Sequence, residues 1–481
     1  MVSNTKLKRK AKGGGIFLST VTRKRITASE RQVALRWQQL LGKKLTTEQR
    51  ERLKVVYPGR VNGDNGPDFL DAVIIMNESS LVKGDVEVHV KTGDWYSHNH
   101  HRDPGYNRVI LHVVAQRDGS SATLTQNGQT VPVLCLPHDS RRKADHHLPC
   151  FQIAKHSDRP TLRRLLSIAG EERFRQKAES FQVELHRGEA KQALWKGMMR
   201  ALGYSRNMKP FEELARRVPL SFLEEVEPGE SLLLKQAWLL GVAGLLPYQR
   251  VGTKPAQEKE TRELEQIWQA VGKETEAMSQ TDWHLSHIYP NNFPVRRIIA
   301  QSYLLQRYHR DGLLQGILRL VKETPMIFGH RWLEDGLIVS SEGYWQDHHD
   351  FGLKTKKSAL LGRSKAGEII ANVILPFAFA WGEVANEPEL TERAIGFCRY
   401  YPKLAENEIT RHMERQLCLE STSDFTACHQ QGLIHLFRNY CSEGKCSQCL
   451  LVNQGLGWGL HPDRSHPPGH SGDGSSRRQP P

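Results

Sequence analysis

The periodicity of the apolar residues changes between residues 136 and 161, and this change constrains the fold more than any other feature of the 481-residue chain. From Val55 to Leu136 the apolar residues fall in short segments typical of β-strands. After a polar stretch, His138–His147, they follow the helical period in long segments up to Gln448. The sequence therefore predicts an α+β protein, in which an N-terminal α/β domain with a mixed sheet precedes a large all-α domain.

The N-terminal part begins with a predicted helix at Ser29 and Glu30, and a second short helix is expected near Thr46–Glu48, whose hydroxyl groups would cap it. The strand segments that follow are Ala72–Met76, Gly84–Lys91, Arg108–Gln116, Ala122–Thr125 and Val131–Leu136. Asn127-Gly128 separates the last two, and Asn-Gly is a strong signal for a hairpin turn. These elements are expected to form one sheet domain.

The second part contains long segments with helical periodicity, rich in Leu, Arg, Glu and Ala. They are Leu162–Glu184, Ala190–Leu202, Ser231–Leu246, Thr261–Ala277, Val295–Lys322, Glu368–Trp381 and Glu389–Leu419. The predicted organisation is a disordered basic tail over 1–27, an α/β domain over 28–150, a helical domain over 151–455 and a disordered tail over 456–481.

The net charge of +14 arises from 67 Lys and Arg against 53 Asp and Glu. Eight of the basic residues precede Glu30 and no acidic residue does, so much of the excess lies in the N-terminal tail, which would either contact phosphate nonspecifically or simply be solvated. No apolar run approaches the ~18–20 residues that cross a bilayer, and the N-terminus lacks a signal-peptide core. We therefore expect a cytoplasmic protein without a membrane span, and with eight cysteines that do not form a disulfide framework.

The segment Asp85–Lys91 alternates strictly between polar residues and valine. On a strand, the valines would point to one face, and Asp85, Glu87, His89 and Lys91 would point to the other. Asp68 follows Gly66-Pro67 at the start of the preceding strand, so a hairpin would bring Asp68 beside Glu87. The alternative is an ordinary antiparallel strand with one solvated face.

Two neighbouring carboxylates suit a hard divalent cation, Mg²⁺ or Mn²⁺. Such a cation would activate water and neutralise a scissile phosphate, while Lys91 or His89 positions the nucleophile. The candidate catalytic residues are therefore Asp68, Glu87, His89 and Lys91, with Asp68 and Glu87 as metal ligands. The next segment adds accessory candidates, unless its histidines only solvate a loop: Trp95, His98, His100, His101, Asp103 and Tyr106.

The strings GPDF and GDVEVHVKTGDWYSHNHHRDPGYNRVILHVV resemble the signature of the bacterial family known as domain of unknown function 2851. Segments 169–178 and 371–383 agree with the same family, and the resemblance covers residues 29–450. More loosely, the region is similar to the PD-(D/E)xK nuclease core, an initial helix followed by a hairpin that bears Asp and then Glu-x-Lys. That likeness implies Glu30 as an accessory acid, Asp68 and Glu87 as ligands, and His89 in place of the expected lysine, with Lys91 two residues later.

Three cysteines are closely spaced near the C-terminus, as Cys441-x4-Cys446-x2-Cys449. Cys428, or His435 on the same preceding helix, would complete a tetrahedral site for zinc or an iron–sulfur cluster. Three reduced thiols in a loop are the alternative interpretation. Similar extensions in PD-(D/E)xK relatives carry a cluster, which keeps iron–sulfur among the expectations.

Arg296 and Arg297 follow Asn291-Asn292-Phe293-Pro294, where Pro294 suits the first turn of a helix and Asn292 its cap. One of these arginines would meet a nucleic-acid phosphate or, alternatively, an interdomain carboxylate.

Altogether, the sequence predicts a metal-dependent nuclease-like hydrolase that cleaves phosphodiester bonds in DNA or RNA. The competing interpretation is a non-catalytic module that binds nucleic acid or protein.

Overall fold

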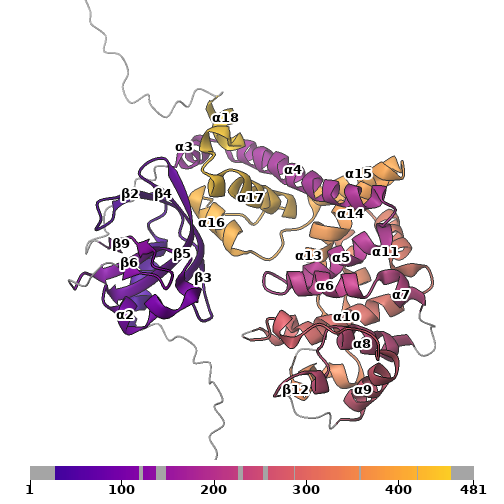
Figure 1. Cartoon of the computed structure of the whole chain (residues 1–481). Helices are drawn as coiled ribbons and strands as arrows, with labels where there is room; N and C mark the ends of the chain where they lie inside the picture. The colour runs from indigo at the N-terminus through magenta and orange to yellow at the C-terminus, as the bar shows by residue number, and fades with distance from the viewer. Residues whose placement is uncertain are drawn as a thin grey trace, which may run out of the picture. The chain divides into compact units, whose positions relative to one another are not determined.

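The computed structural model describes residues 28–118, 123–136, 148–225, 231–252, 258–286, 288–356, 359–419 and 421–456. The chain divides into two compact units, residues 1–145 and residues 146–481 (Figure 1). The predicted tails, 1–27 and 456–481, lie outside the described residues except for residue 456. Each unit is considered by itself below.

The N-terminal unit is built on a seven-stranded mixed sheet. Its strands are β1 (Lys44–Thr46), β2 (Arg52–Tyr57), β3 (Arg60–Val61), β4 (Phe69–Met76), β5 (Ser80–Lys91), β6 (Val109–Gln116) and β9 (Val133–Cys135). They follow the order β1-β2-β4-β5-β6-β9, with β3 also paired to β4. The β4–β5 pair is antiparallel, whereas β5–β6 and β6–β9 are parallel. The prediction of a mixed sheet followed by a helical part is confirmed.

The two ends of this strand order approach each other. The amide of Glu48, just after β1, donates to the carbonyl of Val133 on β9 at 2.8 Å, and the Gln49 side chain accepts from the Val133 amide at 3.0 Å. The sheet is therefore a nearly closed barrel. Outside this path, β7 (Thr123–Leu124) and β8 (Thr130–Val131) form the hairpin predicted around Asn127-Gly128.

The two faces of β5 have different environments. Helix α1 (Ala28–Gln38) covers the valine face, where Val33 and Trp37 pack in one core with Val86 and Val88. The connection from β5 to β6 contains α2 (Asp94–Ser97), η1 (His100–Arg102) and η2 (Pro104–Tyr106). This connection contributes Trp95 to a second, smaller apolar cluster. Because side chains alternate along a strand, Glu87 and His89 point away from the valine core.

The second helix predicted near Thr46–Glu48 is wrong. Residues Lys44–Thr46 form β1 and pair with Arg52–Lys54 of β2. The Thr47 hydroxyl does accept a backbone hydrogen bond, from Glu51 at 3.1 Å, but it closes the turn between the two strands. Hydroxyl and acidic residues occur in turns as well as in helix caps. Here the pairing of Lys44–Thr46 with β2 makes the segment a strand followed by a turn, and not a helix.

The second unit is mainly helical. Its longer helices are α3 (Pro149–His156), α4 (Arg159–His186), α5 (Ala190–Leu202), α6 (Met208–Arg217), α7 (Leu220–Glu225), α8 (Ser231–Val242), α9 (Lys259–Val271), α10 (Pro294–Arg307), α11 (Gly312–Glu323), α12 (His330–Leu337), α13 (Arg363–Ile369), α14 (Leu375–Val384), α15 (Pro388–Tyr400), α16 (Glu408–Gln416), α17 (Ala427–Asn439) and α18 (Leu450–Leu456). Short helical turns are η3 (Pro247–Gln249), η4 (Gln280–Asp282), η5 (Pro290–Asn292), η6 (Gly343–Gln346), η8 (Cys441–Glu443) and η9 (Cys446–Gln448), and η7 (Ile370–Ile374) is a π-helical turn. Two small hairpins pair β10 (Val339–Ser340) with β13 (Ala359–Leu361) and β11 (His348–Asp350) with β12 (Leu353–Lys354).

Two segments predicted as single long helices are each broken in two. Val295–Lys322 divides into α10 and α11, where Gly312 has a φ of +77°, outside the helical region. Glu389–Leu419 divides into α15 and α16, because Pro402 follows α15 and a proline cannot continue a helix. Helical periodicity persists across both breaks, which is why the sequence did not reveal them.

One continuous helical stretch in the described part of the chain, Arg363–Val384, is long and apolar enough to cross a membrane by length and composition alone. The sequence analysis did not anticipate such a stretch. Its most apolar window is 72% buried within the protein, as in a core helix.

Helices α4 and α17 lie side by side and make the most extensive helix–helix contact of the second unit (Figure 1). Two glycines permit this approach. A Cβ atom on Gly170 of α4 would clash with the carbonyl oxygen of Cys428, and one on Gly432 of α17 would clash with that of Leu166. The contact is thus reciprocal, with backbone packed against backbone.

We predict that Gly170→Ala lowers the stability of the helical unit by about 1–3 kcal/mol, because the new methyl group forces the two backbones apart. Thermal unfolding followed by helical circular dichroism measures the change. Gly396→Ala is the matched control, since that glycine also lies within a helix but its Cβ would meet only the flexible end of Met326. If both variants unfold at the wild-type temperature, the close approach of α4 and α17 is not required.

Candidate metal centre

Asp68 and Glu87 lie side by side, as the predicted hairpin requires. The Asp68 amide donates to Glu87 Oε2 at 2.9 Å, and the Val88 amide donates to Asp68 Oδ2 at 3.0 Å. Both side chains are buried, with 6% of Asp68 and 0% of Glu87 exposed. Each carboxylate is therefore held by the backbone of the other strand.

A bulge in β4 sets this register. The β4–β5 pairing shifts between Phe69 and Ala72, and Asp71 within the bulge has a φ of +58°. Its amide donates to Asp85 Oδ1 at 3.0 Å, which holds the unusual backbone conformation in place. Burial raises the pKa of Asp85, and the nearby Arg108 guanidinium partly offsets that rise.

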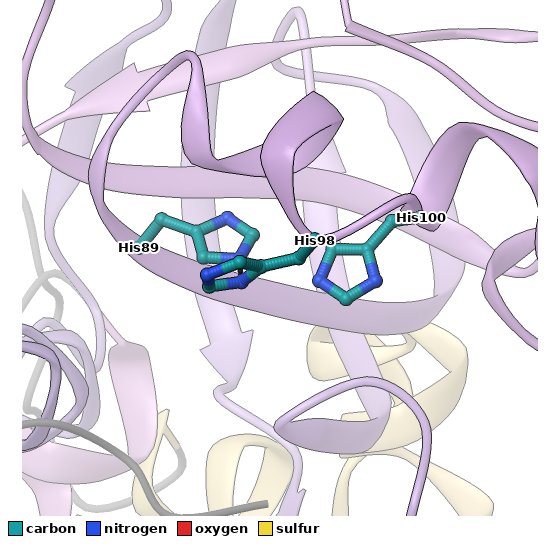
Figure 2. A group of neighbouring side chains, drawn as sticks. All are labelled: His89, His98 and His100. Carbon is teal, nitrogen blue, oxygen red and sulfur yellow. Dashed lines mark hydrogen bonds between the residues drawn. The ribbon is translucent and has the colours of Figure 1, made fainter.

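The second oxygen of Glu87 faces a cluster of histidines. Glu87 Oε1 lies 3.1 Å from His100 Nε2 and 3.4 Å from His89 Nε2. His89 Nε2 in turn lies 3.1 Å from His98 Nδ1. Figure 2 shows the three rings gathered together, His89 from β5 and the other two from the turn that follows α2.

These separations match the coordination shell of a metal ion. Each of His89, His98 and His100 offers a ligand atom, and the three atoms lie within 4.8 Å of one another. Around an ion bound tetrahedrally at ~2.0–2.2 Å, ligand atoms stand about 3.3–3.6 Å apart. The separations of 3.1, 3.1 and 3.4 Å are close to that spacing. The three imidazole nitrogens therefore fit a metal site, and the Glu87 carboxylate lies beside two of them, His89 and His100.

His112 on β6 supports the cluster from behind. Its Nε2 lies 2.9 Å from His89 Nδ1, and its Nδ1 lies 3.1 Å from the hydroxyl of Thr123. Burial lowers the pKa of His112 to about 3, so its ring is neutral near pH 7. If His89 Nδ1–H donates to His112, and His112 Nδ1–H to Thr123, the Nε2 lone pair of His89 is directed at the cluster. A buried hydrogen bond of this kind orients metal-binding histidines.

Aromatic side chains enclose the other edge of the site. Tyr106 stacks on His100 with ring centroids 3.9 Å apart, and Trp95 meets His100 edge-on at 5.4 Å. The Trp95 indole N–H donates to the carbonyl of Leu124 at 2.8 Å. His98 is exposed, so the cluster is open to solvent on that side.

The other predicted residues of this domain lie around the cluster. Lys91 is exposed at the end of β5, so His89 rather than Lys91 occupies the buried position after Glu87. The ring of His101 is near Tyr96, and Asp103 caps η2 by accepting from the Gly105 amide at 2.8 Å. Glu30 shares the buried face of α1 with residues of the valine core. The accessory roles stay predictions.

The structure does not expose Arg296 or Arg297 to a phosphate. Both are buried on α10, with 0% and 3% exposed. Arg296 donates to the carbonyls of Trp345, His348 and Ala359, and Arg297 donates to Leu360, Tyr204 and Asn292. Asn292 is thus a partner of Arg297, and the N-cap of α10 is Phe293, while Pro294 does lie in the first turn. Both guanidinium groups instead satisfy backbone carbonyls between elements, a role that adjacent basic residues in a sequence do not indicate.

The cysteine candidates are only partly brought together. Cys428 lies at the start of the 13-residue helix α17 and Cys441 follows its end, so the helix separates them by ~20 Å. Cys428 contacts the Ser167 carbonyl at 3.6 Å and the thiol of Cys398 instead. The Gln416 side chain bridges Cys441 to a different residue, Cys150.

Sequence reasoning missed His112 and Cys150. His112 is paired with Glu87 through the parallel β5–β6 register, which no local pattern encodes. Cys150 has no metal-like spacing to any other cysteine. The sequence offered one hint for each residue: histidine and cysteine can both bind metals, and these two lie near predicted strands or helices.

The architecture defines a protein with a mixed-sheet domain that carries a buried histidine and carboxylate cluster, followed by a helical part. The chain belongs to the family described as protein of unknown function (DUF2851), whose model matches residues 30–407. No curated protein and no solved structure matches the chain. The comparisons thus support the predicted family and give no support to the looser nuclease likeness.

We predict that Asp68→Ala destabilises the N-terminal unit by about 1–3 kcal/mol, because the buried Val88 amide loses its acceptor. Asp68→Asn keeps an oxygen at that position and is expected to cost less. Hydrogen exchange across residues 85–90, measured by mass spectrometry, reports the loss of protection directly. Equal protection in both variants and wild type would show that the carboxylate does not hold β5.

Proposed function

We propose that the N-terminal unit is a metal-dependent hydrolase that cleaves phosphodiester bonds in DNA or RNA. The observation that carries this proposal is the convergence of His89, His98 and His100, whose ligand atoms lie within 4.8 Å of one another, beside the buried carboxylates of Glu87 and Asp68. Asp68, just before β4, and Glu87 on β5 also supply two neighbouring carboxylates. The proposal rests on geometry and donor chemistry, since the family carries no known activity.

The donor set favours a transition metal over magnesium. Imidazole nitrogens suit Zn²⁺, Mn²⁺ or Fe²⁺, whereas Mg²⁺ is bound mainly by oxygen ligands and water. With three imidazole nitrogens and a carboxylate nearby, Zn²⁺ or Mn²⁺ fits the proposed site better than Mg²⁺. An ion that accepts more than four ligands leaves positions for water and a phosphate oxygen on the side of exposed His98.

Each residue then has a defined part. A bound metal supplies Lewis acidity toward a phosphate and makes water more acidic. His89, His98 and His100 hold it, and Glu87 Oε1 neutralises its charge. Asp68 is a positioning residue, because its contacts go to the backbone of β5 and through its own amide to Glu87.

Exposed cations near the site suit a polyanionic substrate. Lys91 follows His89 by two residues on the same strand, and Arg102 follows His100 by two residues in η1. Arg108 is already paired, because it lies 3.1 Å from Asp71 and 3.9 Å from Asp85, so Lys91 and Arg102 are the cations that the proposal uses. Exposed Lys and Arg contribute to phosphate binding without reading the sequence of a nucleic acid.

The test uses the full chain loaded separately with Zn²⁺, Mn²⁺ or Mg²⁺ and offered labelled single- and double-stranded DNA and RNA. We expect cleavage with Zn²⁺ or Mn²⁺, and a loss of about 100-fold or more in both His100→Ala and Glu87→Gln. Elemental analysis of the same samples should show the loss of one metal equivalent in His100→Ala.

His156→Ala is the matched control, because it removes an exposed histidine of the other unit, whose Nδ1 lies 2.7 Å from the Gln152 carbonyl. It should retain both the metal and the activity. Equal metal content in wild type and His100→Ala would overturn the metal site. Metal binding with nucleic acid bound but uncleaved would instead support the non-catalytic module.

A further inference from the structure

Four cysteines of the second unit gather at one place, although they are far apart in sequence. Gln416 Nε2 lies 3.2 Å from Cys150 Sγ and 3.5 Å from Cys441 Sγ, so the two sulfurs are closer than the sum of those distances. The Cys449 amide donates to the Cys446 carbonyl at 3.2 Å, and α18, which begins after Cys449, packs against α3. The four come from α3, η8, η9 and the residue that precedes α18.

The setting suits thiolates that bind a metal. Cys150, Cys441 and Cys449 are buried, and Cys446 is half-buried. Soft sulfur ligands of this kind favour zinc or an iron–sulfur cluster.

The spacing of the sulfurs distinguishes a cluster from a single ion. Four sulfurs bound at ~2.3 Å to one zinc ion stand about 3.8 Å apart. Among the described residues, no three of these four sulfurs lie within 4.8 Å of one another. A cubane cluster holds its thiolates farther apart, because each binds a different iron.

We propose that Cys150, Cys441, Cys446 and Cys449 hold a [4Fe–4S] cluster. The cluster ties α3, the first helix of the second unit, to the segment that follows α17. Cys150 is thus the fourth ligand, in place of Cys428, which the sequence analysis predicted for that role. This site is independent of the histidine cluster, which lies in the other unit.

The test is anaerobic purification of the full chain, with iron and acid-labile sulfide measured per chain. About four irons and four sulfides are expected in wild type, with the visible absorption of a [4Fe–4S] centre. Cys150→Ser and Cys446→Ser should each lose most of the iron and sulfide. Cys446 is only half-buried, so its variant separates loss of the cluster from loss of the fold, and circular dichroism monitors the helices.

Cys428→Ser is the matched control, since Cys428 is a buried cysteine of the same unit outside the group, and it should keep iron and sulfide at the wild-type level. The proposal is overturned if wild type contains one tightly bound zinc and no iron. It is equally overturned if both Cys150→Ser and Cys446→Ser keep their iron.

Discussion

The carboxylate of Glu87 is fully buried, and the arrangement of the N-terminal unit follows from how that charge is compensated. An ionised carboxylate removed from water costs several kcal/mol unless it is paired and hydrogen-bonded. One oxygen is satisfied by the Asp68 amide, which requires the β4 bulge. The other faces imidazole nitrogens of His89 and His100, which a bound cation would join to it.

The groups that surround the buried Glu87 carboxylate belong both to the fold and to the proposed metal site. The valine face of β5 packs under α1, so the strand is held rigidly, while its opposite face carries the polar cluster. His112 and Thr123 extend the hydrogen bonds inward, and Trp95 and Tyr106 enclose the rings. Such support would keep the proposed ligand atoms in place before a metal or substrate binds.

The second unit also buries charged side chains and satisfies them with backbone groups. Buried Arg296 and Arg297 satisfy backbone carbonyls of the small hairpins, and two glycines allow α4 and α17 to pack backbone to backbone. The four-cysteine group lies near the end of that helix pair. The proposed centre there would join the beginning of the unit to its last helices by metal–thiolate bonds.

The sequence by itself determined the fold class, most of the strands, the Asn127-Gly128 hairpin and the pairing of Asp68 with Glu87, because alternation, turn residues and short connections are local properties. It also singled out the segment whose histidines His89, His98 and His100 lie together in the structure. Only the tertiary structure decided that His112 contacts His89, that Gln416 bridges Cys150 and Cys441, that Lys91 is exposed and that Arg296 and Arg297 are buried. Parallel strand pairing and long-range helix packing bring together residues whose spacing along the chain carries no signal of their contact.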